Sequence, residues 1–263
     1  MKHLIKVKRL FLYVLLALTL VAGAEAQASA AGRTPVVVEL FTSEGCSSCP
    51  PADALLQKLI ELQPVPGAEV IALEEHVDYW NHDGWVDPFS SAEWTVRQEV
   101  YATLTKSDPA TPELVVDGQS QLVGSDGPKA LSEIEKASRA AKAEVKIASA
   151  AGKNSRQFNI SVGSISEDLG KDVAEVWLAI TEDGLHSQVS AGENKSRVLN
   201  HVATLRSLRK IGTAEAHKPV AFTGDADVKI SSRWNPANLR VTVFVQRKKS
   251  RAILGAASAK LEG

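Results

Sequence analysis

The feature that most constrains this chain is a pair of cysteines, Cys46 and Cys49, with two residues between them. They are the only cysteines in the 263-residue sequence. The apolar run 35–41 just before them predicts a strand buried on both faces, and apolar residues at helical spacing in 55–60 predict a helix after them. Since a helix N-terminus stabilises a thiolate, this order indicates redox chemistry. A local disulfide without chemical activity is the alternative interpretation.

The first 26 residues have the pattern of a signal peptide. Basic residues open the chain, a short apolar run covers 10–21, and small residues at 24–30 offer cleavage sites. This run is shorter than the roughly 18 residues that a membrane-spanning helix needs, although an uncleaved anchor is the alternative. We therefore expect a periplasmic or secreted protein with no stable membrane insertion after removal of the leader.

The charge pattern argues against nucleic acid as a partner. The 30 basic and 31 acidic residues are mixed along the chain, and no basic cluster would bind a phosphate backbone or an anionic membrane. Exported proteins commonly use disulfides to link distant segments, but Cys46 and Cys49 can only pair locally or act chemically. A protein or a small thiol is the expected substrate, and we expect neither a cofactor nor a bound metal.

Hydrophobic periodicity predicts two domains with different architectures. In the first, residues 33–142, strand and helix patterns alternate. After the cysteines we expect a strand at 69–76, a helix from Ser90 or Ser91 to 104, a hairpin at 114–123 and a helix at 129–142. In the second, residues 143–263, apolar residues alternate with period two between turn clusters. We therefore expect an α/β domain followed by a β-rich domain of antiparallel sandwich type.

We predict different roles for the two cysteines in thiol-disulfide exchange. Cys46 precedes the helix, so we predict that its sulfur is the more exposed and attacks the substrate, whereas Cys49 resolves the mixed disulfide. Ser47 and Ser48 can donate hydrogen bonds to a thiolate or simply cap the helix. The chain has neither a second CxxC nor a histidine pair at zinc-finger spacing, which argues against a zinc site. With a strand before and a helix after, the motif predicts a thioredoxin-like fold.

Thr111-Pro112 stands just before the predicted hairpin. Thioredoxin-like folds carry a cis-proline facing the dithiol at this point of the chain. Although only about 5–6% of X-Pro bonds in folded proteins are cis, the preceding CxxC leads us to predict a cis bond here.

The loop 76–85 is expected to emerge beside Cys46, because the ends of neighbouring parallel strands share one sheet edge. His76 or Asp78 would tune the thiol or relay a proton, and Trp80 would help to floor a groove for a partner peptide. A well-packed loop without these roles is the alternative. We also expect Arg97 to form a structural ion pair, with Asp78 or Asp87 as its partner.

Several segments together resemble a secreted bacterial family catalogued as domain of unknown function twelve twenty-three. The matching segments are 42–53, 76–80, 84–89, 97–101, 111–118 and 192–194. The resemblance implies a thioredoxin-like domain followed by a β-rich domain, and it implies little about the substrate.

The sequence thus favours an exported thiol-disulfide oxidoreductase that uses Cys46 and Cys49 on protein or small thiol substrates, with Thr111 and Pro112 docking an extended backbone. Two alternatives stay open. One is a copper or other metal carrier that adds His76 or His82 to the same cysteines. The other is a binding protein in which the β-rich half holds the partner and the dithiol has no function.

Overall fold

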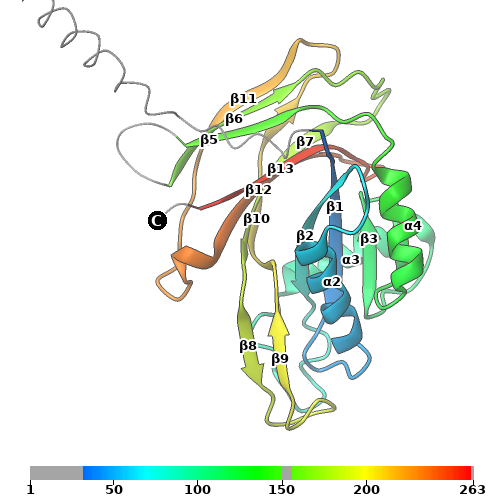
Figure 1. Ribbon diagram of the computed structural model, residues 1–263, viewed down its shortest axis with the longest axis vertical. Helices are drawn as coiled ribbons and strands as arrows, with labels where there is room; N and C mark the ends of the chain where they lie inside the picture. Colours follow the sequence, from blue (N-terminus) through cyan, green and yellow to red (C-terminus); the bar gives the residue numbers. More distant parts are fainter. Residues whose placement is uncertain (1–31, 150–155, 262–263) are drawn as a thin grey trace, which may run out of the picture.

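The computed structural model describes residues 32–149 and 156–261 (Figure 1). The predicted signal peptide, residues 1–26, lies outside these ranges. Among the residues described, no helix is long and apolar enough to cross a membrane. The protein has a mixed α/β fold in which one large sheet is accompanied by two small antiparallel sheets.

The first half alternates strands and helices as the sequence predicted. Its elements are β1 (Thr34–Thr42), α2 (Pro50–Leu62), β2 (Ala68–His76), α3 (Ala92–Thr105), β3 (Glu113–Val116), β4 (Ser120–Val123) and α4 (Gly127–Ala137). Ser91 caps α3 by accepting a hydrogen bond from the backbone N–H of Glu93. Strand β1 lies between a parallel partner, β2, and an antiparallel partner, β3.

The second half is almost entirely antiparallel strand. Its elements are β5 (Val145–Ser149), β6 (Gln157–Gly163), β7 (Ala174–Glu182), β8 (Leu185–Gln188), β9 (Val198–His201), β10 (Thr204–Ala214), β11 (Val220–Asp227), the short 3₁₀ helix η1 (Pro236–Asn238), β12 (Leu239–Arg247) and β13 (Ile253–Lys260). The β-rich character expected of this half is therefore confirmed.

The two halves share one eight-stranded sheet, which the sequence did not predict. Its strand order is β13-β12-β7-β10-β2-β1-β3-β4, so strands from both halves meet where β10 lies beside β2. This contact is short and parallel, pairing Thr204 with Glu74. Just before it, the backbone N–H of Glu74 donates to the carbonyl of Ala203 at 2.9 Å. The start of β10 therefore lies beside the end of β2.

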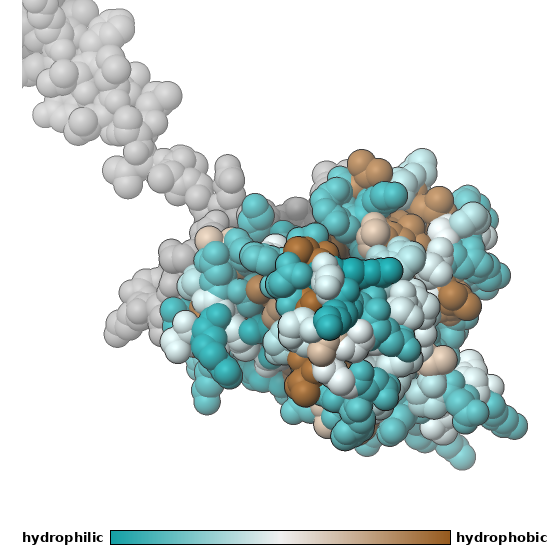
Figure 2. Space-filling model, turned by 90° about the horizontal axis from the view of Figure 1, so that it is seen from below, coloured by the Kyte–Doolittle hydropathy of each residue, from teal (hydrophilic) through white to brown (hydrophobic). Residues whose placement is uncertain are grey.

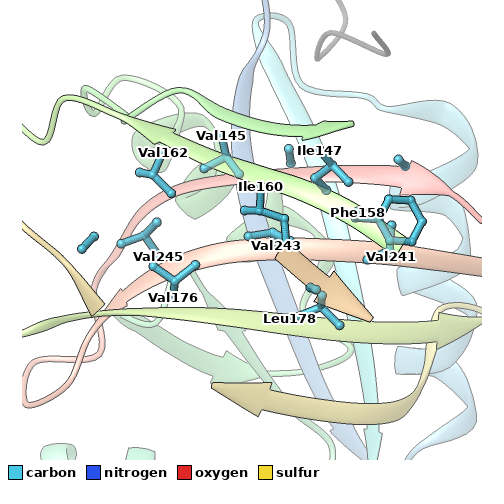
Figure 3. Packing of buried hydrophobic residues seen from close by; sticks show 14 of the residues in the cluster. Val145, Ile147, Phe158, Ile160, Val162, Val176, Leu178, Val241, Val243 and Val245 are labelled. Carbon is cyan, nitrogen blue, oxygen red and sulfur yellow. The ribbon is translucent and has the colours of Figure 1, made fainter. Parts of the chain in front are cut away.

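Apolar cores fill both sides of this sheet. On one side, α2 and α4 cover β1, with residues such as Leu40 and Leu56 fully buried. Under the three-stranded sheet β11-β6-β5, side chains of β5 and β6 point toward those of β7 and β12 (Figure 3). Another cluster joins Leu73 of β2 and Trp94 of α3 to Phe244 of β12, so the halves also share a core.

The hairpin β8–β9 projects from the sheet toward the end where β1 stops (Figure 1). Its strands pair Leu185 with His201 and Gln188 with Val198. The residues between them, 189–197, form a loop that we call the cap loop. The arrangement brings this loop, which lies far along the chain, to the segment that carries the cysteines.

Candidate functional site: a covered disulfide beside a buried histidine–carboxylate cluster

The cysteines form a disulfide at the N-terminus of α2. The Cys46–Cys49 bridge joins Cα atoms 5.4 Å apart. Cys49 is the N-cap residue of α2, and its carbonyl accepts from the backbone N–H of Ala52 at 2.8 Å. Pro50 and Pro51 occupy the first helical positions, where a missing N–H leaves no intrahelical bond unmade. The predicted order of strand, dithiol and helix is confirmed.

The prediction that Cys46 has the exposed sulfur is wrong for this state of the protein. Both Cys46 and Cys49 are 0% exposed, whereas the intervening Ser47 and Ser48 are exposed. The prediction considered only the helix that follows Cys46, whereas a distant segment, the cap loop, also binds the backbone of Glu44, Cys46 and Ser47.

Asn194 makes the main contact between the cap loop and the disulfide segment. Its side-chain amide donates to the backbone carbonyls of Glu44 and Cys46, each at 2.9 Å, and the residue is fully buried. Arg197 donates to the side-chain oxygen of Asn194 at 3.0 Å, which fixes the orientation of the amide. Next to Asn194, the carboxylate of Glu193 accepts from the backbone N–H of Ser47 at 3.0 Å.

The two serines have different surroundings. The hydroxyl of Ser48 lies 3.3 Å from the sulfur of Cys46 and is the donor, since a disulfide sulfur carries no hydrogen. Its role in tuning the thiol stays a prediction. Ser47 instead contributes its backbone N–H to Glu193, and its side chain is exposed.

The Thr111–Pro112 peptide bond is cis, as predicted. The indole N–H of Trp80 donates to the hydroxyl of Thr111 at 2.8 Å. Trp80 also packs on Gly45, since a Cβ added there would lie 2.9 Å from the Cβ of Trp80. Trp80 therefore connects the cis-proline segment to the residue just before the disulfide.

The loop after β2 does not bring all of its predicted site residues to the sulfurs. The carboxylate of Asp78 accepts a hydrogen bond from Thr95 of α3 at 2.6 Å, so it fixes the loop to that helix.

The end of the molecule where the hairpin projects is mostly hydrophilic, with small separate hydrophobic patches (Figure 2). The peptide groove expected around Trp80 stays a prediction.

His76 belongs to a buried cluster of its own. Its Nδ1 lies 2.7 Å from a carboxylate oxygen of Asp87, and its Nε2 lies 3.4 Å from one of Glu74. A second histidine, His201 at the end of β9, has Nε2 3.0 Å from Glu44 and Nδ1 3.3 Å from Glu74. We call these five residues the histidine–carboxylate cluster; none is more than 2% exposed.

Opposite charges outweigh burial in setting the ionisation of this cluster. Burial alone would lower the pKa of His201, but the charge of Glu74 and the hydrogen bonds to Glu44 and Glu74 together outweigh it and raise that pKa to about 9. Burial would likewise raise the pKa of Glu74, yet His201 and His76 lower it to about 2. For His76, the effect of burial is overcome by Asp87 and Glu74, and its pKa lies well above the ordinary value.

Asp53 of α2 adds a group that titrates near neutrality. Burial, followed by repulsion from Glu74, raises its pKa to about 7, although the hydroxyl of Thr42 donates to it at 2.7 Å. Asp53 interacts electrostatically with both histidines of the cluster. Electrostatic interactions therefore connect the histidine–carboxylate cluster to the first turn of α2.

A separate buried ion pair lies on the other face of β1 and β2. Arg97 of α3 donates to Glu39 at 2.6 Å and lies 3.4 Å from Glu75. The prediction of Asp78 or Asp87 as the partner of Arg97 is wrong. Glu75 and His76 are neighbours on β2 and therefore face opposite sides of the sheet. Arg97 reaches the face that carries Glu39 and Glu75, whereas Asp87 bonds His76 on the other side.

Comparison with models of protein families shows the family of this chain. A family described as a protein of unknown function, DUF1223, matches residues 37–246. The chain belongs to the DUF1223 family. The DUF1223 match includes the disulfide, the cis-proline segment, the cap loop and every residue of the histidine–carboxylate cluster. A comparison with curated proteins finds no match to the chain.

Two solved structures share the fold of this DUF1223 protein. Protein AGR_C_4864 from Agrobacterium tumefaciens is 24% identical, with a TM-score of 0.64 over 88% of this chain and 96% of its own. HBP35 of Porphyromonas gingivalis is 17% identical, with a TM-score of 0.62 over 87% of this chain and 75% of its own. At these identities the likeness concerns the fold alone.

The sequence analysis named His76 but missed Glu74, His201 and Asn194. Glu74 stands two residues before His76 on a predicted strand, so both had to share one face, and that spacing could have drawn attention to Glu74. Asn194 lies in a segment that resembles the family, but nothing in the sequence placed it or His201 at the site, because both reach it from more than a hundred residues away.

Proposed function

We propose that this DUF1223 protein is an exported thiol-disulfide oxidoreductase with a thioredoxin-like first unit and a β-rich second unit. The observation that carries the proposal is the Cys46–Cys49 disulfide at the N-terminus of α2, joined through Trp80 to the cis Thr111–Pro112 bond. The strand order β2-β1-β3-β4 with α2, α3 and α4 supports the thioredoxin-like assignment. Protein or small thiol substrates in the periplasm or outside the cell fit this chemistry.

In the reduced protein, the Cys46 thiolate attacks one sulfur of a substrate disulfide. A mixed disulfide forms, and the other substrate sulfur leaves as a thiolate that takes up a proton. Cys49 then gives up its proton and attacks the Cys46 sulfur, which releases the second substrate thiol and forms the bridge seen in the structure. The substrate gains two electrons and the dithiol loses two; the reverse sequence reduces the protein.

Burial of Cys46 adds a condition to this chemistry. A substrate reaches the sulfur only after the cap loop moves, which breaks the two hydrogen bonds from Asn194 and the one from Ser47 to Glu193. The structure then corresponds to a closed, oxidised state. The helix N-terminus would stabilise the Cys46 thiolate once the bridge opens.

The experiment is an insulin-reduction assay combined with alkylation of reduced protein across a pH series. We expect catalysed reduction, abolished in Cys46→Ser and Cys49→Ser, and a Cys46 thiol pKa below that of free cysteine. Ser232→Ala, in the second half, serves as the control for a serine change. Absence of catalysis together with an ordinary thiol pKa would refute the proposal.

The metal-carrier alternative with the cysteines receives no support from the geometry. Both ring nitrogens of His76 face carboxylates, those of Asp87 and Glu74. In the part of the chain that the structure describes, the group of side chains able to hold a metal ion contains neither cysteine.

A further inference from the structure

We propose that Glu74, His76 and His201 form a binding site for a divalent transition-metal ion, with Zn²⁺ as the ion that fits best. One carboxylate oxygen and two imidazole nitrogens lie within 4.8 Å of one another. Zn²⁺ takes this combination of histidine nitrogen and carboxylate oxygen in proteins. The site is distinct from the disulfide and departs from our expectation that the chain holds no metal.

The two distances from the histidines to Glu74 suit a metal ion, and the three ligand atoms all lie within 4.8 Å of one another. Ligands about 2.0–2.2 Å from a tetrahedral zinc ion stand roughly 3.3–3.6 Å from one another. His76 Nε2 lies 3.4 Å from one oxygen of Glu74, and His201 Nδ1 lies 3.3 Å from the other. Rotating the Glu74 carboxylate between the two rings would let one ion contact all three side chains.

The carboxylates bonded to the far ring nitrogens of the two histidines are further evidence for a metal ion. Metal-binding histidines usually donate their other ring N–H to a carboxylate, which fixes the tautomer. Here the far nitrogen of His76 bonds Asp87 at 2.7 Å, and the far nitrogen of His201 bonds Glu44 at 3.0 Å. Both near nitrogens are thereby turned toward Glu74.

The supporting contacts continue outward from the ligands. The hydroxyl of Thr204 donates to Glu74 at 2.9 Å, and the indole N–H of Trp85 donates to Glu44 at 2.8 Å. Such hydrogen-bonded carboxylates are typical of the layer around a metal site.

A buried nitrogen without a partner provides a second, independent observation. His76 Nε2 is fully buried, points toward Glu74 and has no hydrogen-bond partner. Burying a polar atom without a partner is unfavourable. A metal ion bound at this nitrogen would give it a direct ligand bond, whereas at present its interaction with Glu74 is an ion-pair contact at 3.4 Å without a hydrogen bond.

The position of the site indicates a structural role. Glu74 and His76 belong to β2, whereas His201 ends β9, immediately before β10 joins the sheet. An ion here would link the hairpin that carries the cap loop to the strand beside β1. Because the three side chains are at most 1% exposed, we infer that loading accompanies folding or movement of the hairpin.

The test uses the purified protein with its disulfide oxidised, so that thiolates cannot bind the metal. Protein refolded with ZnCl₂ and then dialysed is analysed for metal content by mass spectrometry. We expect about one zinc ion per chain and a melting temperature that falls when a strong chelator is added. His201→Gln and Glu74→Gln should lose the ion, whereas His186→Gln, an exposed histidine on the same hairpin, should retain it.

Two further measurements test the site even if a ligand variant fails to fold: variants of the carboxylates that bond the two histidines, and absorption spectroscopy of the wild-type protein. Asp87→Asn and Glu44→Gln should weaken zinc binding about 10–100-fold. Co²⁺ in the wild-type site should give tetrahedral ligand-field absorption without a thiolate charge-transfer band. The proposal is overturned by wild-type protein that refolds without retaining zinc, or by zinc that stays bound in folded His201→Gln and Glu74→Gln.

Discussion

Replacing Asn194 with alanine tests whether the cap loop controls access to the disulfide. Asn194 is fully buried, and its amide makes two hydrogen bonds to backbone carbonyls of Glu44 and Cys46. The substitution removes both bonds, and each is worth about 0.5–1.5 kcal/mol. Closure of the cap loop should therefore lose about 1–3 kcal/mol, which corresponds to a roughly 5–150-fold larger open population.

The assay is the rate at which dithiothreitol reduces the disulfide, followed by trapping the thiols with a maleimide after an acid quench. If opening precedes reduction in a rapid equilibrium, the rate rises with the open population, so Asn194→Ala should react about 5–150 times faster than wild type. Asn200→Ala, at an exposed position on β9 of the same hairpin, is the matched control and should react at the wild-type rate.

Equal reduction rates for Asn194→Ala and wild type would contradict this prediction, because they would mean that the two hydrogen bonds of Asn194 do not limit access of dithiothreitol to the disulfide. An equal acceleration in Asn200→Ala would also count against it, since it would indicate general loosening of the hairpin. Circular dichroism of each variant checks that the fold is retained.

Three further predictions concern the buried charges and the β3–β4 turn. Burial and Glu39 hold the pKa of Glu75 well above its ordinary value despite Arg97. The native state therefore keeps a proton on Glu75 that the unfolded chain releases. The free energy of unfolding should fall as the pH rises above about 4.3 toward the raised pKa. Glu75→Gln should reduce that fall by up to about 1.4 kcal/mol per pH unit in urea unfolding across a pH series; an unchanged slope contradicts the assignment. Arg97→Met leaves the buried carboxylate of Glu39 without its cation and should cost about 3–5 kcal/mol in the same assay, a cost below 1 kcal/mol being incompatible with the ion pair. Gly118→Ala would place a Cβ 2.0 Å from the carbonyl oxygen of Arg251 at a φ of +68° and should destabilise by about 2–5 kcal/mol, more than Gly67→Ala, whose added Cβ meets nothing within 4 Å.

Local features of the fold were predictable because they depend on neighbouring residues. The buried strand before Cys46 and the helix after it, the cap at Ser91 and the hairpin turn at Asp117-Gly118 all follow from short patterns, and all are present. The cis bond at Pro112 followed from combining that proline with the CxxC motif. The domain division at 142/143 stays a prediction of the sequence.

The remaining features depend on contacts between distant residues. Pairing of Thr204 with Glu74 extends the first sheet into the second half, and a single pair of strand residues leaves no pattern in the sequence. Asn194 hydrogen-bonds to the backbone carbonyl of the buried Cys46 from 148 residues away. The prediction of an exposed sulfur failed for this reason, since it considered only the helix that follows the cysteine.

The central claim is that Cys46 and Cys49 exchange between dithiol and disulfide in function. The most direct test is the equilibrium reduction potential of this pair, measured by incubation in glutathione buffers and alkylation of the free thiols. We expect a value between about −120 and −270 mV, the range of thiol-disulfide oxidoreductases. A potential below about −300 mV, typical of structural disulfides, would contradict it.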